Sequence, residues 1–421
     1  VLRSPGHSRC CTYCLNSGLR ERHNMQLLTL IRTNYYLKIM ARFLEKRMKQ
    51  YLLGGIRYIL KAPTPETIDS LVGVEKILII RPNFRLGNAL ISTPVIDAFR
   101  ERFPSARIDY LATDKTWPLL QQRPVDYFFL LSRSAILRPW QCVTLLRRLR
   151  AQRYDLAVQV SGGSTSGFIV TRLIGARYTM GSGKGHQRWY SIEAEGTSSH
   201  AYDAIVNLTR PLGVACRNRP LLQITEQERY QAITKIQQLA SLHSEQPPDT
   251  NFIAIFVGGH QNKRWPLEFW LMLIDAMEAR KIRYIVFLGP EEFRLLAPIE
   301  KRLKSSLYGS LCSPLPIRHF AAVLERARLL VTPDSGPMHL AAALDVATIS
   351  LVRQKKSLAF VPREAYDTIL WHPEISTVIE AIRTNLNGQN ATDPVQSASA
   401  TNQPTQWVTP PPSAAPLHSS H

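Results

Sequence analysis

A stretch between residues 330 and 344 combines the features of a site for a phosphate group. Its sequence, Leu-Val-Thr-Pro-Asp-Ser-Gly-Pro-Met-His-Leu-Ala-Ala-Ala-Leu, predicts a buried strand, a tight turn and an apolar helix. Asp334 or Ser335 can cap that helix, and Pro337 suits its first turn, where a backbone N–H has no partner. Gly336 lacks a Cβ atom, so a ligand can approach the backbone closely. The unpaired N–H groups and the helix dipole then favour a phosphate, although an ordinary strand-to-helix turn gives the same pattern.

A second candidate site follows the strand predicted at residues 76–80. The loop at 81–88 leads into a helix over 89–102 and a strand over 107–112, which together form a βαβ unit. Gly87 is therefore expected at the carboxyl edge of a parallel sheet, where ligands bind in such folds. The loop holds one glycine and no G-x-G-x-x-G, so the sequence does not indicate a dinucleotide-dependent enzyme.

Strands and helices alternate through both halves of the chain, which predicts an α/β protein with two doubly wound domains facing a cleft. We expect an N-terminal extension over residues 1–73, a first domain over 74–225 and a second domain over 226–384. The remaining residues, 385–421, are rich in Asn, Gln, Ser, Thr, Ala and Pro. They cannot bury enough apolar surface to fold and are expected to form a disordered tail.

Three separated motifs resemble glycosyltransferase family 9, whose best-known members are the ADP-heptose:lipopolysaccharide heptosyltransferases. The motifs are Ile-Leu-Ile-Ile-Arg-Pro-Asn-Phe-Arg-Leu-Gly-Asn-Ala-Leu-Ile-Ser-Thr-Pro at residues 77–94, Lys-Arg-Trp-Pro-Leu-Glu at residues 263–268, and Asp-Ser-Gly-Pro-Met-His-Leu-Ala-Ala-Ala-Leu at residues 334–344. Their order, and their positions after predicted strands in two α/β halves, match the family over residues 74–383.

The resemblance implies a GT-B fold, in which two Rossmann-like domains face a cleft. The first domain would bind the acceptor, and the second would bind a nucleotide-sugar donor, for which an ADP-linked sugar is expected. The family implies inversion at the anomeric carbon without a catalytic metal, and no cofactor beyond the donor itself. The acceptor would be lipopolysaccharide or a related envelope glycan at the cytoplasmic face of the membrane.

The resemblance also implies which residues hold the diphosphate. Lys263 is similar to the family's phosphate-binding lysine. Since Pro337 has no N–H, the backbone donors expected in the cradle are those of Ser335, Gly336, Met338 and His339. A histidine that simply packs inside its helix is the alternative for His339.

Further residues are expected at the cleft from the same resemblance. Asp334 is similar to an acid of the family that orients the cradle or a sugar hydroxyl. Glu292, or its neighbour Glu291, follows a strand where the family binds ribose or base. Contacts with substrate are expected from Arg85, Gly87 and Arg264.

One position departs from the family pattern and bears on catalysis. Inversion needs a general base that takes the proton of the acceptor hydroxyl. The heptosyltransferases use an aspartate directly after the glycine of the first motif, whereas this chain has Asn88, which cannot take a proton at ordinary pH. Another group could serve instead, or Asn88 could only position the acceptor, or the chain could be a catalytically silent nucleotide- or glycan-binding protein. The weak candidates for another base are Asp97, Asp114 and His186.

The composition is that of a globular protein with a basic surplus. The 421 residues carry a formal net charge of +20, which favours polyanionic partners such as phosphorylated substrates or anionic lipid. No recognition motif for nucleic acid accompanies this charge, so we expect no nucleic-acid partner. The six cysteines show no disulfide framework, which favours the reducing cytoplasm.

The N-terminal part of the chain predicts a contact with a membrane surface. Apolar residues recur at helical spacing over residues 27–53, with six basic residues and one acid (Glu45) between them. We expect residues 26–62 to hold the protein on the inner face of the cytoplasmic membrane, and a helix packed on the first domain is the alternative. Residues 1–24 have loop composition and are expected to be an upstream extension rather than folded structure.

Overall fold

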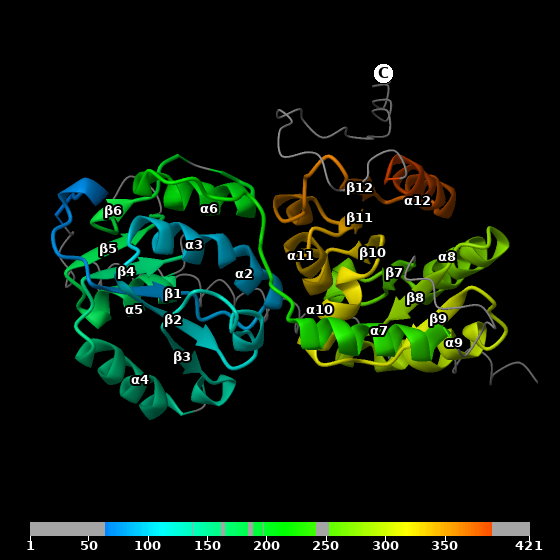
Figure 1. Cartoon of the computed structure of the whole chain (residues 1–421), viewed down its shortest axis with the longest axis horizontal. Helices are drawn as coiled ribbons and strands as arrows, with labels where there is room; N and C mark the ends of the chain where they lie inside the picture. The colour runs from blue at the N-terminus through cyan, green and yellow to red at the C-terminus, as the bar shows by residue number, and fades with distance from the viewer. Residues whose placement is uncertain are drawn as a thin grey trace, which may run out of the picture. The chain divides into compact units, whose positions relative to one another are not determined.

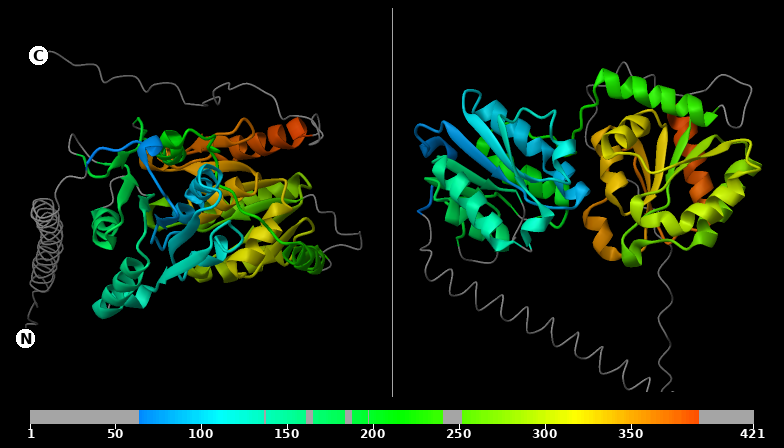
Figure 2. Two further views of the ribbon diagram at one scale, coloured as in Figure 1. Left: turned by 60° about the vertical axis from the view of Figure 1, so that its left-hand side comes forward. Right: turned by 90° about the horizontal axis from the view of Figure 1, so that it is seen from below.

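The computed structural model describes residues 64–389, except 137, 161–164, 184–187, 197 and 241–251. It contains two six-stranded parallel sheets with helices on both faces, which confirms the predicted α/β architecture (Figures 1 and 2). We call the part with β1–β6 the first lobe and the part with β7–β12 the second lobe. Among the described residues, no helix is long and apolar enough to cross a membrane.

The first lobe has the strand order β3-β2-β1-β4-β5-β6. Its strands are β1 (Lys76–Ile80), β2 (Arg107–Thr113), β3 (Tyr127–Leu131), β4 (Leu156–Gln159), β5 (Tyr178–Gly181) and β6 (Ile192–Glu193). Its α-helices are α2 (Leu86–Ile91), α3 (Thr93–Arg102), α4 (Pro139–Ala151), α5 (Thr165–Ile174) and α6 (Ala201–Thr209). Short 3₁₀ turns are η1 (Ile68–Ser70), η2 (Trp117–Leu119), η3 (Arg133–Ile136) and η4 (Arg210–Leu212).

The second lobe has the order β12-β11-β10-β7-β8-β9, which repeats the topology of the first lobe. Its strands are β7 (Ile253–Phe256), β8 (Tyr284–Phe287), β9 (Gly309–Cys312), β10 (Leu329–Pro333), β11 (Ala347–Val352) and β12 (Thr368–Trp371). Its α-helices are α7 (Glu226–Ala240), α8 (Leu267–Ala279), α9 (Phe293–Leu303), α10 (Ile317–Glu325), α11 (Gly336–Ala343) and α12 (Ile375–Gln389). Its 3₁₀ turns are η5 (Gln261–Lys263), η6 (Pro290–Glu292) and η7 (Lys355–Ala359).

Each sheet is buried on both faces, which explains why its central strands are continuous apolar runs. In β1, Ile77 and Ile79 pack against the side of the sheet covered by α3 and α6. Leu78 and Ile80 point the other way, toward α4 and α5. The alternation follows from the two-residue period of a strand, so every residue from 77 to 80 has a core to fill.

The first βα connection differs from the expected loop and single helix. Helix α2 already begins at Leu86, so Gly87 and Asn88 lie in a helical first turn rather than in a loop. The helical pattern is also broken at Ser92, because Pro94 has no N–H for the carbonyl of Leu90. That carbonyl instead accepts a hydrogen bond from the hydroxyl of Thr93 at 2.7 Å.

Of the predictions for the two ends of the chain, only the start of the C-terminal tail falls within the described residues. Helix α12 continues to Gln389, so the polar tail expected from residue 385 begins later than predicted. The expected basic helix at 26–62 and the rest of the tail lie outside the described residues.

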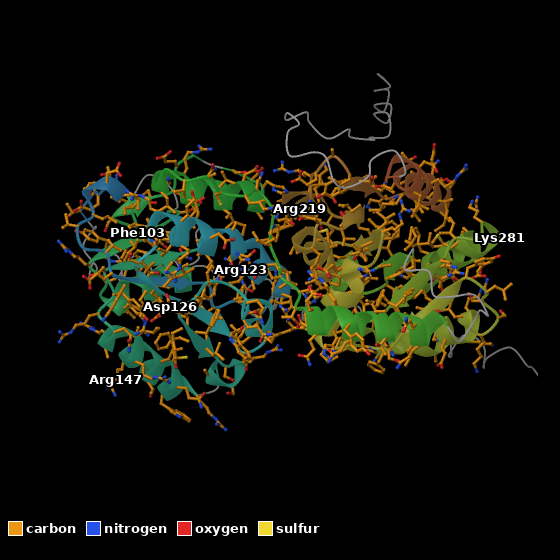
Figure 3. The ribbon with its side chains drawn as sticks, viewed as in Figure 1. Phe103, Arg123, Asp126, Arg147, Arg219 and Lys281 are labelled. Atoms are coloured by element: carbon orange, nitrogen blue, oxygen red, sulfur yellow. The ribbon has the colours of Figure 1, made fainter. Side chains whose placement is uncertain are left out.

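Residues 213–225 link the lobes and bond to both. The N–H of Leu221 donates to Thr93 Oγ1 at 2.8 Å, and the N–H of Leu222 donates to the carbonyl of Ala343 at 2.9 Å. Arg219, labelled in Figure 3, is only 3 % exposed. Its Nε donates to the carbonyl of Ala342 at 2.7 Å and its Nη1 to Asp367 Oδ2 at 2.8 Å.

The lobes also share apolar packing. Leu90 of α2 and Leu119 of η2 belong to the same buried cluster as Phe320 of α10 and Leu340 of α11. Helices α2 and α11 are therefore joined by side-chain packing as well as by the linker.

Replacing Arg219 by methionine should destabilise the protein by about 3–5 kcal/mol, because Asp367 would remain buried without its cation. Arg217→Met is the control, since Arg217 pairs with Asp345 in an exposed position and its loss should cost less than about 1 kcal/mol. Urea unfolding at neutral pH measures both free energies of unfolding, and equal values for the two variants would contradict the assignment.

Candidate active site at the switch points of the two sheets

The residues predicted at the cleft follow the strands at which each sheet reverses its order. The order changes direction between β1 and β4 in the first lobe and between β7 and β10 in the second. Gly87 follows β1, Lys263 follows β7 and Asp334 follows β10. In open α/β sheets, the carboxyl ends of the strands at this switch point form the crevice where ligands bind.

Lys263 and Asp334 form an ion pair between Nζ and Oδ2. The carboxylate is buried, whereas the lysine side chain is 32 % exposed at the boundary with solvent. Apart from this ion pair, Asp334 Oδ2 has no hydrogen-bond partner among the described residues. The pair therefore holds one ammonium group in a fixed position beside the start of α11.

The N-terminus of α11 has no side-chain cap, so the predicted capping by Asp334 or Ser335 is wrong. Ser335 occupies the N-cap position, but its hydroxyl bonds to Thr332 Oγ1 at 2.9 Å instead. The carboxylate of Asp334 is engaged by Lys263. The first N–H groups of the helix consequently have no side-chain acceptor and can meet an anion.

The N–H of His339 cannot belong to that set of donors. His339 is the fourth residue of α11, so its N–H is used within the first turn of the helix. The N–H groups of Ser335, Gly336 and Met338 remain as candidate donors, with the side chain of Met338 buried in the lobe.

The imidazole of His339 instead joins the two lobes. It is 6 % exposed, and its Nδ1 lies 3.1 Å from the hydroxyl of Tyr202 on α6. The ring also lies so close to Gly87 that a Cβ atom there would overlap Cδ2. Burial, aided by the charge of Lys263 and opposed by Asp334, lowers the pKa of His339 to about 4, so the ring is neutral at pH 7. His339 is thus both packed, as the alternative expected, and part of the contact between the first and third motifs.

Asn88 lies beside this contact and is partly buried. Its carbonyl accepts a hydrogen bond of 3.3 Å from Arg81 Nε. Arg81 lies directly after β1, and burial lowers the pKa of its guanidinium. Arg81 was not among the residues predicted at the site, although its position directly after a buried apolar strand is a sequence signal for one. Arg85 differs, because it is exposed at the N-cap of α2.

Arg264 follows β7, and Glu292 follows β8, the neighbouring strand of the same sheet. Glu292 is buried, and its carboxylate accepts the N–H of Gly259 at 3.3 Å. Arg264 Nη2 lies 3.7 Å from Glu292 and 3.8 Å from the exposed Glu291. Burial raises the pKa of Glu292. Of the two candidate acids, Glu292 of η6 is therefore the one that bonds to the loop after β7.

The residues considered as alternative bases are differently placed. Asp97 on α3 is paired with the buried Arg123, and burial raises its pKa. Asp114 is exposed and accepts a hydrogen bond from Ser132 at 3.1 Å. His186 lies outside the described residues.

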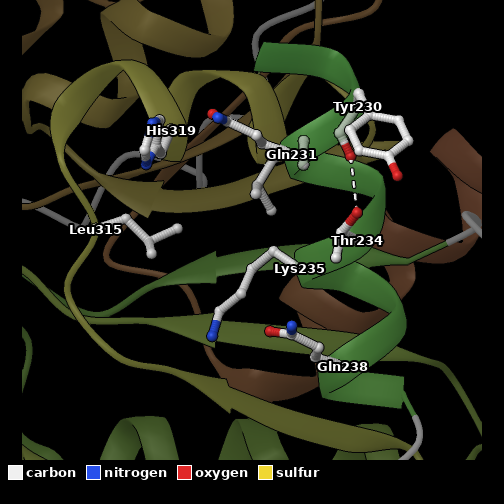
Figure 4. A pocket seen from close by; sticks show the side chains of 9 residues that line it. Tyr230, Gln231, Thr234, Lys235, Gln238, Leu315 and His319 are labelled. Carbon is white, nitrogen blue, oxygen red and sulfur yellow. Dashed lines mark hydrogen bonds between the residues drawn. The ribbon is translucent and has the colours of Figure 1, made fainter. Parts of the chain in front are cut away.

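A cavity of about 330 Å³ lies elsewhere in the second lobe, against α7 and α10. Figure 4 shows Tyr230, Thr234 and Lys235 along α7, with Leu315 and His319 across from them. None of the residues predicted at the cleft line this cavity, so it is separate from the candidate active site.

Two Rossmann-like lobes of equal topology, each with a switch point, have the architecture of the GT-B fold. Residues 142–389, more than half of the chain, match glycosyltransferase family 9 (heptosyltransferase). The chain belongs to this family and is a glycosyltransferase.

Individual relatives agree with this placement. The chain is 24% identical to lipopolysaccharide heptosyltransferase 3 of Escherichia coli over 70% of its own length and 85% of the relative. The crystal structure of a family 9 glycosyltransferase from Veillonella parvula matches with a TM-score of 0.63 and 20% identity, covering 76% of this chain and 99% of that one. E. coli ADP-heptose lipopolysaccharide heptosyltransferase II matches with a TM-score of 0.59 and 19% identity, covering 75% and 99%.

Replacing Lys263 by alanine should weaken the binding of a nucleoside diphosphate by about 1.5–3 kcal/mol, the loss of one charge-assisted contact. Lys301→Ala on the exposed side of α9 removes the same charge away from the crevice and should leave affinity unchanged. Calorimetric titration with ADP measures both. Equal affinity of Lys263→Ala and wild type would remove Lys263 from the site.

The stability of the protein should depend on the protonation of His339. Its pKa is about 4 in the folded protein, against an ordinary value of about 6.5 in the unfolded chain. Between these values the unfolded chain binds more protons, so stability falls as the pH is lowered from about 6.5 to about 4, by up to about 3 kcal/mol.

Denaturant unfolding of wild type and His339→Gln across this pH range isolates the effect, because all other titrating groups are shared. The variant should lose less stability on acidification. His319→Gln, which changes an exposed histidine of α10, should behave like wild type. Parallel pH curves for wild type and His339→Gln would show that the buried ring does not titrate as described.

Proposed function

We propose that this chain is an inverting, metal-independent glycosyltransferase that moves a heptose-like sugar from an ADP-linked donor to lipopolysaccharide or a related envelope glycan. The observation that carries the proposal is the Lys263–Asp334 pair beside the uncapped N-terminus of α11. The names of the relatives, which are lipopolysaccharide heptosyltransferases, support the class of donor and acceptor.

In the proposed reaction the acceptor hydroxyl oxygen attacks the anomeric carbon, and the bond from that carbon to the β-phosphate oxygen breaks. Negative charge develops on the departing diphosphate, so fixed positive groups at that point lower the barrier. The ammonium of Lys263 and the N–H groups at the start of α11 are such groups, and they take the part that a metal ion plays in other transferases. Asp334 acts by fixing the lysine.

On the acceptor side, the proposal gives Asn88 a positioning role. Its amide can hold the acceptor hydroxyl through hydrogen bonds but cannot take its proton, so the proton passes to water as the new bond forms. The partly buried guanidinium of Arg81, bonded to the carbonyl of Asn88, supplies a cation on the same side, which suits an acidic acceptor such as a phosphorylated glycan.

A second candidate follows from the same residue. Because Asn88 stands where the family has its base, the chain could retain the fold to bind a nucleotide or glycan without turnover.

For the cellular location, we propose that residues 26–62 hold the protein on the inner face of the cytoplasmic membrane.

A transfer assay with a panel of nucleotide sugars tests the proposal. Wild type should release ADP and form product with at least one donor, and Asp334→Ala should lower the rate by about 100-fold or more. Asp275→Ala, on the exposed side of α8, is the matched control and should keep the wild-type rate. A chelator should leave the rate unchanged, and NMR of the product should show the inverted anomer.

Asn88→Asp separates the two candidate functions. Turnover by wild type establishes an enzyme that works without the usual aspartate. Donor binding without turnover, with activity appearing only in Asn88→Asp, would contradict the proposal and favour a binding protein.

A further inference from the structure

Helix α4 of the first lobe has two chemically different faces. Leu145, Leu146 and Leu149 pack toward the sheet in a cluster with Phe129 of β3. The opposite side carries Trp140, Val143, Arg147 and Arg150, at the i, i+3, i+7, i+10 spacing of one helical stripe, and all four are exposed. We call these four residues the α4 stripe.

The apolar end of the α4 stripe is unusually open to solvent. Trp140 is 63 % exposed and Val143 is 47 % exposed. Helix α4 packs on α5, β3 and η3 of its own lobe, and β3 is the edge strand of the sheet. Figure 3 shows Arg147 on the outer side of α4, away from the sheet. The stripe therefore faces solvent at the edge of the lobe.

The charge around the stripe has one sign. Residues 132–153 contain six arginines and no acidic residue. No carboxylate of the described residues forms an ion pair with any of these six, which are Arg133, Arg138, Arg147, Arg148, Arg150 and Arg153. Arg148 lies over the ring of Phe129, whereas Arg147 and Arg150 of the α4 stripe are exposed. Exposed cations without a carboxylate beside them favour an anionic partner.

We propose that the α4 stripe is a docking surface for an anionic lipid bilayer. Arginines can contact lipid phosphates while tryptophan and valine enter the boundary between headgroups and acyl chains, which is where amphipathic helices bind. Tryptophan is enriched at this level of a membrane. A nucleic-acid duplex would satisfy the arginines but would leave the exposed Trp140 and Val143 without an apolar environment.

This surface is distinct from residues 26–62 and does not depend on the proposed function, because vesicle binding needs no nucleotide sugar. It would present the first lobe to the membrane in a defined orientation, with β3 and α4 at the lipid surface.

The test uses the full chain and vesicles of phosphatidylglycerol and phosphatidylcholine in roughly equal amounts, with phosphatidylcholine alone as the neutral comparison. The variant Trp140→Ser/Arg147→Glu/Arg150→Glu should bind anionic vesicles about tenfold or more weaker than wild type. The matched control is Met272→Ser/Lys301→Glu/Lys304→Glu, which changes one exposed apolar residue and the same net charge on α8, α9 and the residue after it. The control should bind as wild type does.

Three results would overturn the proposal. In the first, the stripe variant binds vesicles as tightly as wild type does. In the second, the stripe variant and the control variant are weakened equally. In the third, the stripe variant loses binding to a DNA or RNA duplex but keeps its binding to vesicles. The first result would mean that other segments attach the protein to the vesicle. The second would mean that vesicle binding depends on net charge alone. The third would favour a nucleic-acid partner.

Tryptophan fluorescence gives an independent measurement if the triple variant fails to fold. Residues 26–62 contain no tryptophan, so quenching by brominated lipid reports on other parts of the chain. Brominated anionic vesicles should quench wild type more than Trp140→Phe. Equal quenching of the two proteins would show that Trp140 does not enter the bilayer.

Discussion

The contact between Gly87 and His339 is the constraint on which the rest of the candidate site depends. The imidazole fills the space that a side chain at position 87 would need, so α2 and α11 approach each other at this point. Tyr202 fixes the ring from a third helix. This contact, together with the packing of Leu90 on Leu340, brings Asn88 close to the start of α11, beside which the Lys263–Asp334 pair lies.

The topology explains why motifs so distant in sequence share a site. The strand order reverses next to β1 in the first lobe and next to β7 in the second. The loops after β1, β7 and β10 begin at those reversals. A crevice arises there because neighbouring connections run to opposite faces of the sheet. The proposed acceptor side and the proposed donor side would each use the switch point of one sheet.

Local features were predictable from sequence, whereas features set by distant contacts were not. The continuous apolar strands and the strand–turn–helix at 330–344 follow from short-range pattern, and both are present. The predicted capping of α11 was wrong because Thr332 bonds to the hydroxyl of Ser335 and Lys263 pairs with the carboxylate of Asp334. The role of His339 depends on Gly87 and Tyr202, far away in the chain, and no spacing rule brings those residues together. The break at Ser92 was signalled by Pro94, but its repair by the hydroxyl of Thr93 is visible only in three dimensions.

The apolar cluster shared by the lobes has a thermodynamic consequence. Leu90 and Leu119 of the first lobe are fully buried in the same cluster as Leu340 of the second. Any separation of the lobes exposes these side chains to water, and hydration of apolar surface raises the heat capacity. A ligand that draws an opened form back together would bind with a negative change in heat capacity, even where its own contacts are entirely polar.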